Sequence, residues 1–109
     1  MTEQQLNAIF YINREIERLR KRISELEGLP SETELYRELN AKLEEKIFRE
    51  IQIRKYIEGI EDPQIKAIAE LRFLYQRSWV DIAAEVSPRW KDIDRTTVAK
   101  KLRRYLRKH

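Results

Sequence analysis

The sequence predicts an all-α protein with an N-terminal antiparallel helical hairpin, coiled-coil-like, followed by a three-helix unit that contains a helix-turn-helix. Three observations lead to this prediction. The composition, 39% charged and 41% hydrophobic residues with two Gly and three Pro in 109 residues, is typical of helices and coiled coils. Apolar residues recur at helical spacing along most of the chain. The few Gly and Pro residues separate these periodic segments and divide the chain into residues 1–59 and 60–109.

The first segment, from about Glu3 to Glu27, has the apolar spacing of a coiled coil. Its apolar residues step alternately by three and four positions, with Ile mostly at the first heptad position and Leu at the fourth in the later part. A second helix is expected over Glu32–Glu58, because Ser31 and Glu34 form a capping box and Gly59 is suited to end the helix. The connection between the two helices is short, so they should pack antiparallel.

The hairpin is expected to serve as a dimerisation module. Its second helix has more apolar surface than one partner helix covers, and an isolated two-helix hairpin buries too little surface to offset its ordering entropy. We therefore expect a homodimer formed through residues 3–58. The alternative is an intramolecular hairpin docked on the C-terminal part of the same chain. The predicted dimerisation residues are Ile9, Ile12, Ile16, Leu19, Ile23, Leu26, Leu39, Leu43, Ile47 and Ile51.

Capping signals predict three shorter helices in the C-terminal part. Asp62-Pro63 starts the first, which should end near Gln76-Arg77. The second runs over Trp79–Val86 behind the N-cap residue Ser78, and Asp94 caps the last helix. The second helix contains small alanines that let the last helix approach closely, as in a helix-turn-helix.

The last helix, Arg95–His109, concentrates the positive charge of the chain. It holds seven Lys or Arg residues and no acid, so in a chain of net charge +4 the other residues sum to −3. Val98, Leu102, Tyr105 and Leu106 form one apolar stripe, and cations surround the rest of the helix. Because a helix of this kind suits a major groove, double-stranded DNA is the expected partner. A solvated basic face without a ligand is the competing interpretation.

Position along this helix separates expected base readers from phosphate binders. Outward residues near its N-terminus are expected to meet base edges, as an arginine does when it binds guanine O6 and N7. Cations further along, and beside the helix pair, are expected to bind phosphates and so to position the protein. The base-reading candidates are Arg95, Thr96, Ala99 and Lys100; the phosphate candidates are Arg77, Ser78, Arg89, Lys91, Lys101, Arg103, Arg104, Arg107 and Lys108.

Four segments in the C-terminal part carry a family resemblance: Leu71–Tyr75, Ser78–Val86, Asp94–Val98 and Leu102–Leu106. They resemble the region 4 helix-turn-helix of sigma-70-type factors, and more closely the small phage transcriptional regulators of the ArpU and RinA type. The resemblance covers residues 62–109 and extends to the preceding part only in general character. It implies base reading by the early positions of the last helix and a contact with RNA polymerase. This chain departs from the family in its longer turn between the two helices.

Several function classes are disfavoured by what the sequence lacks. There is no Cys and a single His, so disulfide frameworks and Cys/His zinc sites are excluded, and no metal or cofactor is expected. No apolar run approaches the roughly twenty residues of a membrane span, and the N-terminus lacks a secretory pattern. A soluble protein of the bacterial cytoplasm is expected. The absence of a Gly-rich phosphate loop, and carboxylates spaced for salt bridges along helices, argue against an enzyme.

The sequence therefore predicts a DNA-binding transcriptional regulator, which the resemblance places in phages or prophages. Two other functions remain open. One is the small, DNA-recognising subunit of a phage packaging terminase, which would form a ring rather than a dimer. The other is a helical scaffold that binds no DNA.

Overall fold

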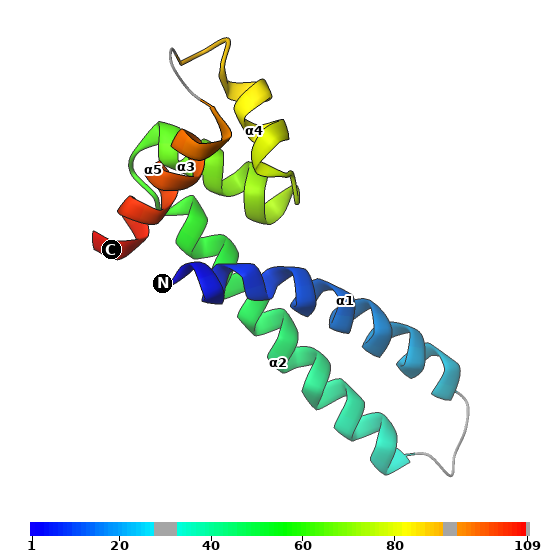
Figure 1. Ribbon diagram of the computed structural model, residues 1–109. Helices are drawn as coiled ribbons and strands as arrows, with labels where there is room; N and C mark the ends of the chain where they lie inside the picture. Colours follow the sequence, from blue (N-terminus) through cyan, green and yellow to red (C-terminus); the bar gives the residue numbers. More distant parts are fainter. Residues whose placement is uncertain (28–32, 91–93, 109) are drawn as a thin grey trace.

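The computed structural model describes residues 1–27, 33–90 and 94–108, and helices account for most of them (Figure 1). No strand occurs in these three ranges, and the predicted all-α class is confirmed. The elements in chain order are α1 (Glu3–Leu26), α2 (Thr33–Glu58), α3 (Pro63–Ala69), the π-helical segment η2 (Glu70–Leu74), α4 (Trp79–Val86) and α5 (Arg95–Lys108).

Helices α1 and α2 lie side by side and run in opposite directions (Figure 1). A capping box that the sequence analysis did not identify starts α1: the Thr2 hydroxyl accepts from the Gln5 amide at 3.2 Å, and the Gln5 side chain accepts from the Thr2 amide at 2.8 Å. The capping box expected at Ser31 lies outside the described residues. Gly59 follows α2 as expected, and its amide donates to the Lys55 carbonyl at 3.0 Å.

The apolar seam of the hairpin packs α1 against α2 within one chain. Of the ten residues expected at a dimer interface, five are buried here, at 7% exposure or less: Ile9, Ile12, Ile16, Ile23 and Leu39. Leu19, Leu26, Leu43 and Ile47 are half-buried, and Ile51 is exposed. The five buried residues are therefore covered within one chain, as in the alternative arrangement, whereas Ile51 remains exposed.

A single apolar core continues from the hairpin into the C-terminal helices. Ile57 at the end of α2 and Ile60 after it are buried, and the rings of Phe10 and Phe73 lie 6.3 Å apart, which joins α1 to η2. The core then includes Ile65, Ile68, Ile82, Val86, Val98 and Leu102. The core thus crosses the boundary expected at residues 59 and 60. The molecule is elongated, with extents of 61 × 25 × 17 Å, because the hairpin projects from this shared core (Figure 1).

The third predicted helix forms but changes character before its end. Asp62 caps α3 by accepting from the amides of Gln64 and Ile65 at 2.9 and 3.2 Å. The helix continues as η2, which ends at Leu74 rather than near Gln76-Arg77. Gln76 then adopts a positive φ of 56°, a left-handed conformation that stops the helix and turns the chain toward α4.

Candidate nucleic-acid interface

Helices α4 and α5 pack against each other through small and branched side chains. The Ser78 hydroxyl accepts from the Asp81 amide at 3.1 Å and so starts α4 where the sequence predicts. Ala83 on α4 and Val98 on α5 are buried in the shared core. Helix α5 also packs on α3, and its C-terminal part approaches the N-terminus of the chain (Figure 1). The core thus fixes which face of α5 points outward.

The start of α5 is set by Asp94. One carboxylate oxygen of Asp94 accepts from the Thr97 amide at 2.8 Å. This backbone hydrogen bond is the main cause that lowers the pKa of Asp94 below its ordinary 3.8, and Lys100 lowers it slightly further. The ionised carboxylate also interacts favourably with the positive end of the helix dipole. Asp94 therefore anchors the helix end that is expected to read bases.

The side of α5 opposite Val98 and Leu102 is exposed and cationic. We call it the outer face of α5, and it consists of Thr96, Lys100, Arg103, Arg104 and Arg107. These positions follow one another at helical spacing, so they share one side of the helix. No acidic residue lies within α5 itself.

Three of the four base-reading candidates are exposed: Arg95, Thr96 and Lys100. The fourth, Ala99, does not lie on the outward side as the sequence analysis expected, because it is 6% exposed and belongs to the buried side of α5. The inward stripe is wider than four residues, and Ala99 extends it beside Val98. A methyl group in this position packs against the protein and is not available for a thymine methyl.

Arg103 pairs with an acid at the other end of the chain. Its Nε and Nη2 donate to the two carboxylate oxygens of Glu3 at 3.0 and 3.3 Å, in a bidentate arrangement. This pairing raises the pKa of Arg103 above its ordinary value. The guanidinium also lies 6.0 Å from the ring of Trp79. An expected phosphate binder is thus held against the first turn of α1.

The remaining cations of α5 divide between two sides. Lys101 is half-buried, and its ammonium donates to the Gln64 side chain at 2.9 Å, so it faces α3 rather than the outer face. Arg104, at the edge of the outer face, also lines the hollow that Lys101 lines, and so does Lys108. Arg107 instead lies beside Arg103 in a hollow next to Thr2 and Glu3.

The phosphate candidates outside α5 lie around α4. Arg77 and Ser78 precede this helix and Arg89 follows it, and all three are exposed. The Ser78 hydroxyl already serves as the N-cap acceptor. Lys91 lies outside the described residues.

Arg72 is a residue at this site that the sequence analysis did not single out. Its guanidinium lies 4.7 Å from the ring of Trp79 and 6.0 Å from that of Phe10, and Nη1 donates to the Arg77 carbonyl at 3.0 Å. Its Nε is buried without a hydrogen-bond partner. Arg72 therefore ties α1, η2 and the start of α4 together. The sequence offered one indication of this role, which is that Arg72 lies between the apolar residues Leu71 and Phe73.

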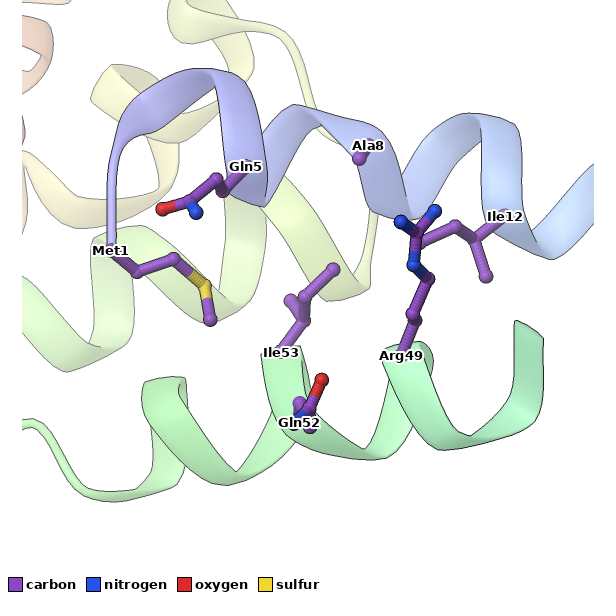
Figure 2. A pocket seen from close by; sticks show the side chains of 7 residues that line it. All are labelled: Met1, Gln5, Ala8, Ile12, Arg49, Gln52 and Ile53. Atoms are coloured by element: carbon purple, nitrogen blue, oxygen red, sulfur yellow. The ribbon is translucent and has the colours of Figure 1, made fainter. Parts of the chain in front are cut away.

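A further hollow lies between α1 and α2, and Figure 2 shows its lining. The polar groups there are the amides of Gln5 and Gln52 and the guanidinium of Arg49. Neither a carboxylate nor an imidazole is among these lining residues, so the hollow offers hydrogen bonds rather than an acid–base pair. Across the described ranges, no three His, Cys, Asp or Glu side chains gather as metal ligands would.

Comparison of the chain with protein-family models, with curated proteins and with solved structures finds no match. Among the helices of the described ranges, none combines the length and apolar character that crossing a membrane requires. The geometry of α4 and α5 and the chemistry of their exposed side chains therefore provide the basis for inferring a function.

Proposed function

We propose that this protein is a sequence-specific DNA-binding transcriptional regulator that places α5 in the major groove. The observation that carries the proposal is the outer face of α5, which is exposed, cationic and free of acids within the helix. Like charges at helical spacing repel one another, and a polyanion relieves that repulsion. Double-stranded DNA supplies both a row of phosphates and a groove about 12 Å wide that admits a helix.

The proposal assigns different tasks to the two ends of α5. Arg95 and Thr96 are exposed in its first turn and Lys100 follows one turn later, so these three meet base edges. Arg104 and Arg107 lie further along and bind phosphates. The side chains of Arg77 and Arg89, on either side of α4, add contacts to the DNA backbone.

The regulatory part of the proposal comes from the family resemblance of residues 62–109. Small phage and prophage regulators with a sigma-70 region 4-like domain act at promoters, and RNA polymerase is therefore proposed as a second partner. The order of a short capped helix, a turn and a cationic helix is the feature of this chain that supports the resemblance. The longer turn before Asp94 distinguishes it from that family.

The test of DNA binding is a selection from a random duplex library with the full chain, followed by affinity measurements over a salt series. We expect enrichment of one sequence motif, and an affinity that falls steeply with salt because bound cations are released from the phosphates. Absence of binding to any duplex at low salt would overturn the proposal. Binding without an enriched motif would remove the base-reading role.

Two variants separate the roles within α5. Arg95→Ala should cost about 1–3 kcal/mol on the selected site and relax the preference at one base pair. Arg104→Ala should weaken binding to all duplexes alike and reduce the salt slope by roughly one. Arg22→Ala removes the same charge from an exposed position on α1 and should leave both quantities unchanged. Equal effects of the first two on selected and random DNA would contradict the division.

A further inference from the structure

The side of α2 that faces away from α1 carries a second heptad pattern. The buried residues Leu39 and Ile53 face α1. On the opposite side, residues spaced alternately by four and three form what we call the outer stripe of α2: Arg37, Ala41, Glu44, Phe48, Ile51 and Lys55, all of them exposed. Residues at this spacing lie along one line of a helix and meet a neighbouring helix of the same kind.

Two large apolar residues lie at the centre of the outer stripe. Phe48 is 60% exposed and Ile51 is 42% exposed, and Ile47 beside them is half-buried. A charged residue flanks this apolar pair on each side along the stripe: Glu44 precedes Phe48, and Lys55 follows Ile51. A central apolar patch between opposite charges is typical of the contact between two helices, whereas a solvated helix face has no reason to group its apolar residues.

The charges of the stripe match a second copy that runs in the opposite direction. If Phe48 packs on Ile51 of the second copy, the same register places Glu44 opposite Lys55, and the two-fold axis repeats each contact. The register also places the small Ala41 opposite Glu58, which leaves room for Arg37, one turn away, to reach that carboxylate. A parallel pair would instead place Glu44 against Glu44 and Lys55 against Lys55.

We propose that the outer stripe of α2 is a self-association surface, on which two copies of this chain pack antiparallel about a two-fold axis between residues 49 and 50. The apolar seam stays inside each chain, where it joins α1 to α2. The proposed dimer interface therefore lies on the outer stripe of α2 and not on the seam between α1 and α2, where the sequence analysis expected it. Because only Phe48 and Ile51 of each copy contribute apolar surface at its centre, the dimer should dissociate reversibly. The inference concerns α2 alone and does not depend on DNA binding.

The test is sedimentation equilibrium of the full chain without DNA over a concentration series. The wild type should be a reversible dimer. Glu44→Lys places a lysine opposite Lys55 at both ends of the contact, and Lys55→Glu does the converse. Each reversal should weaken dimerisation by about tenfold or more, and the double variant Glu44→Lys/Lys55→Glu should restore it, because the opposite charges then face each other again.

Two control variants test whether the loss of dimerisation is specific to the outer stripe of α2. Glu25→Lys makes the same charge change at an exposed position on α1 and should leave dimerisation unchanged, while Phe48→Lys should abolish it. Far-ultraviolet circular dichroism verifies that each variant is folded. A wild-type monomer throughout the series, a dimer that tolerates Phe48→Lys, or a double variant as weak as the single ones would each overturn the proposal.

Discussion

Helices α1 and α5 share one plan, an apolar stripe on the core side and a polar remainder, but they balance their charges differently. Helix α1 holds four acids and five bases, and one pair of them, Glu15 and Arg18, forms an ion pair at 3.2 Å. Helix α5 holds seven bases and no acid, and the acid that pairs with its Arg103 belongs to α1. A balanced face is stable in water as it is, whereas an unbalanced one gains from an anionic partner.

This difference indicates that the two helices serve different purposes within one core. The mixed charges of α1 solubilise a helix whose apolar side packs on α2 and η2. The excess charge of α5 stays on a surface that the core holds outward, and Glu3 is the point at which the two helices meet in an ion pair. Substitutions in the core should therefore have the largest effects, those at the Glu3–Arg103 ion pair smaller ones, and those at the cap of α5 the smallest.

The largest expected effect comes from the side chain that joins the two regions. Phe73 is fully buried and its ring faces that of Phe10 on α1. Phe73→Ala should lower the free energy of unfolding by about 3–5 kcal/mol, because it leaves a cavity between α1 and the C-terminal helices. Urea denaturation measures this. Tyr75→Ala, at a residue that is 65% exposed, is the matched control and should change stability by less than about 1 kcal/mol.

A smaller effect is expected where the charges of the two helices meet. Glu3→Gln removes the anion that pairs with Arg103, so the guanidinium becomes available to a phosphate. Binding to any duplex should strengthen about two- to fivefold, and the salt slope should rise by roughly one, because an exposed ion pair contributes less than about 1 kcal/mol. Fluorescence anisotropy over a salt series measures both. Glu25→Gln is the control, and an unchanged slope in Glu3→Gln would show that Arg103 does not contact DNA.

The smallest effect is expected at the cap of α5 and depends on pH. The pKa of Asp94 is lower in the folded protein than its ordinary value of 3.8, so the ionised carboxylate stabilises the fold. This contribution is complete above the ordinary value and is lost as the pH falls through the lower, folded value. Asp94→Asn keeps an oxygen acceptor but does not ionise, so the loss of helicity below about pH 4 should be shallower than in the wild type. Circular dichroism across this range measures the difference, and superimposable profiles would exclude the role.

Local features of the fold were predictable because their causes lie within a few residues. The caps at Asp62, Ser78 and Asp94 each form where a side-chain oxygen precedes free amides, and each of the three side chains accepts a backbone hydrogen bond in the structure. The change to a π-helix after Ala69 was not predictable. It coincides with Arg72 lying against Phe10 and Trp79, which come from two other helices.

The candidate site was predictable in part for the same reason. The exposure of Thr96 and Lys100 follows from helical spacing around the apolar stripe, whereas Arg95 lies in line with Val98 and Leu102 and is exposed at the first position of the helix. Ala99 lies three residues before Leu102 and seven before Leu106, so the same spacing places it on the buried side, and the expectation that it faces outward was wrong. The partners of Lys101 and Arg103, which are Gln64 and Glu3, lie far away in the sequence, and spacing within one helix contains no information about them.

The all-helical class, the starts of α3, α4 and α5 and the concentration of positive charge on α5 could be derived from the sequence, because propensity, capping and composition are local properties. What each apolar surface covers depends on how the helices pack in three dimensions. Heptad spacing is satisfied equally by a second helix of the same chain and by one from another chain, and here the seam of α1 packs on α2. Because α1 covers the other side of α2, Phe48 and Ile51 point outward. The shared core also brings Glu3 next to Arg103, which lies far away in the sequence.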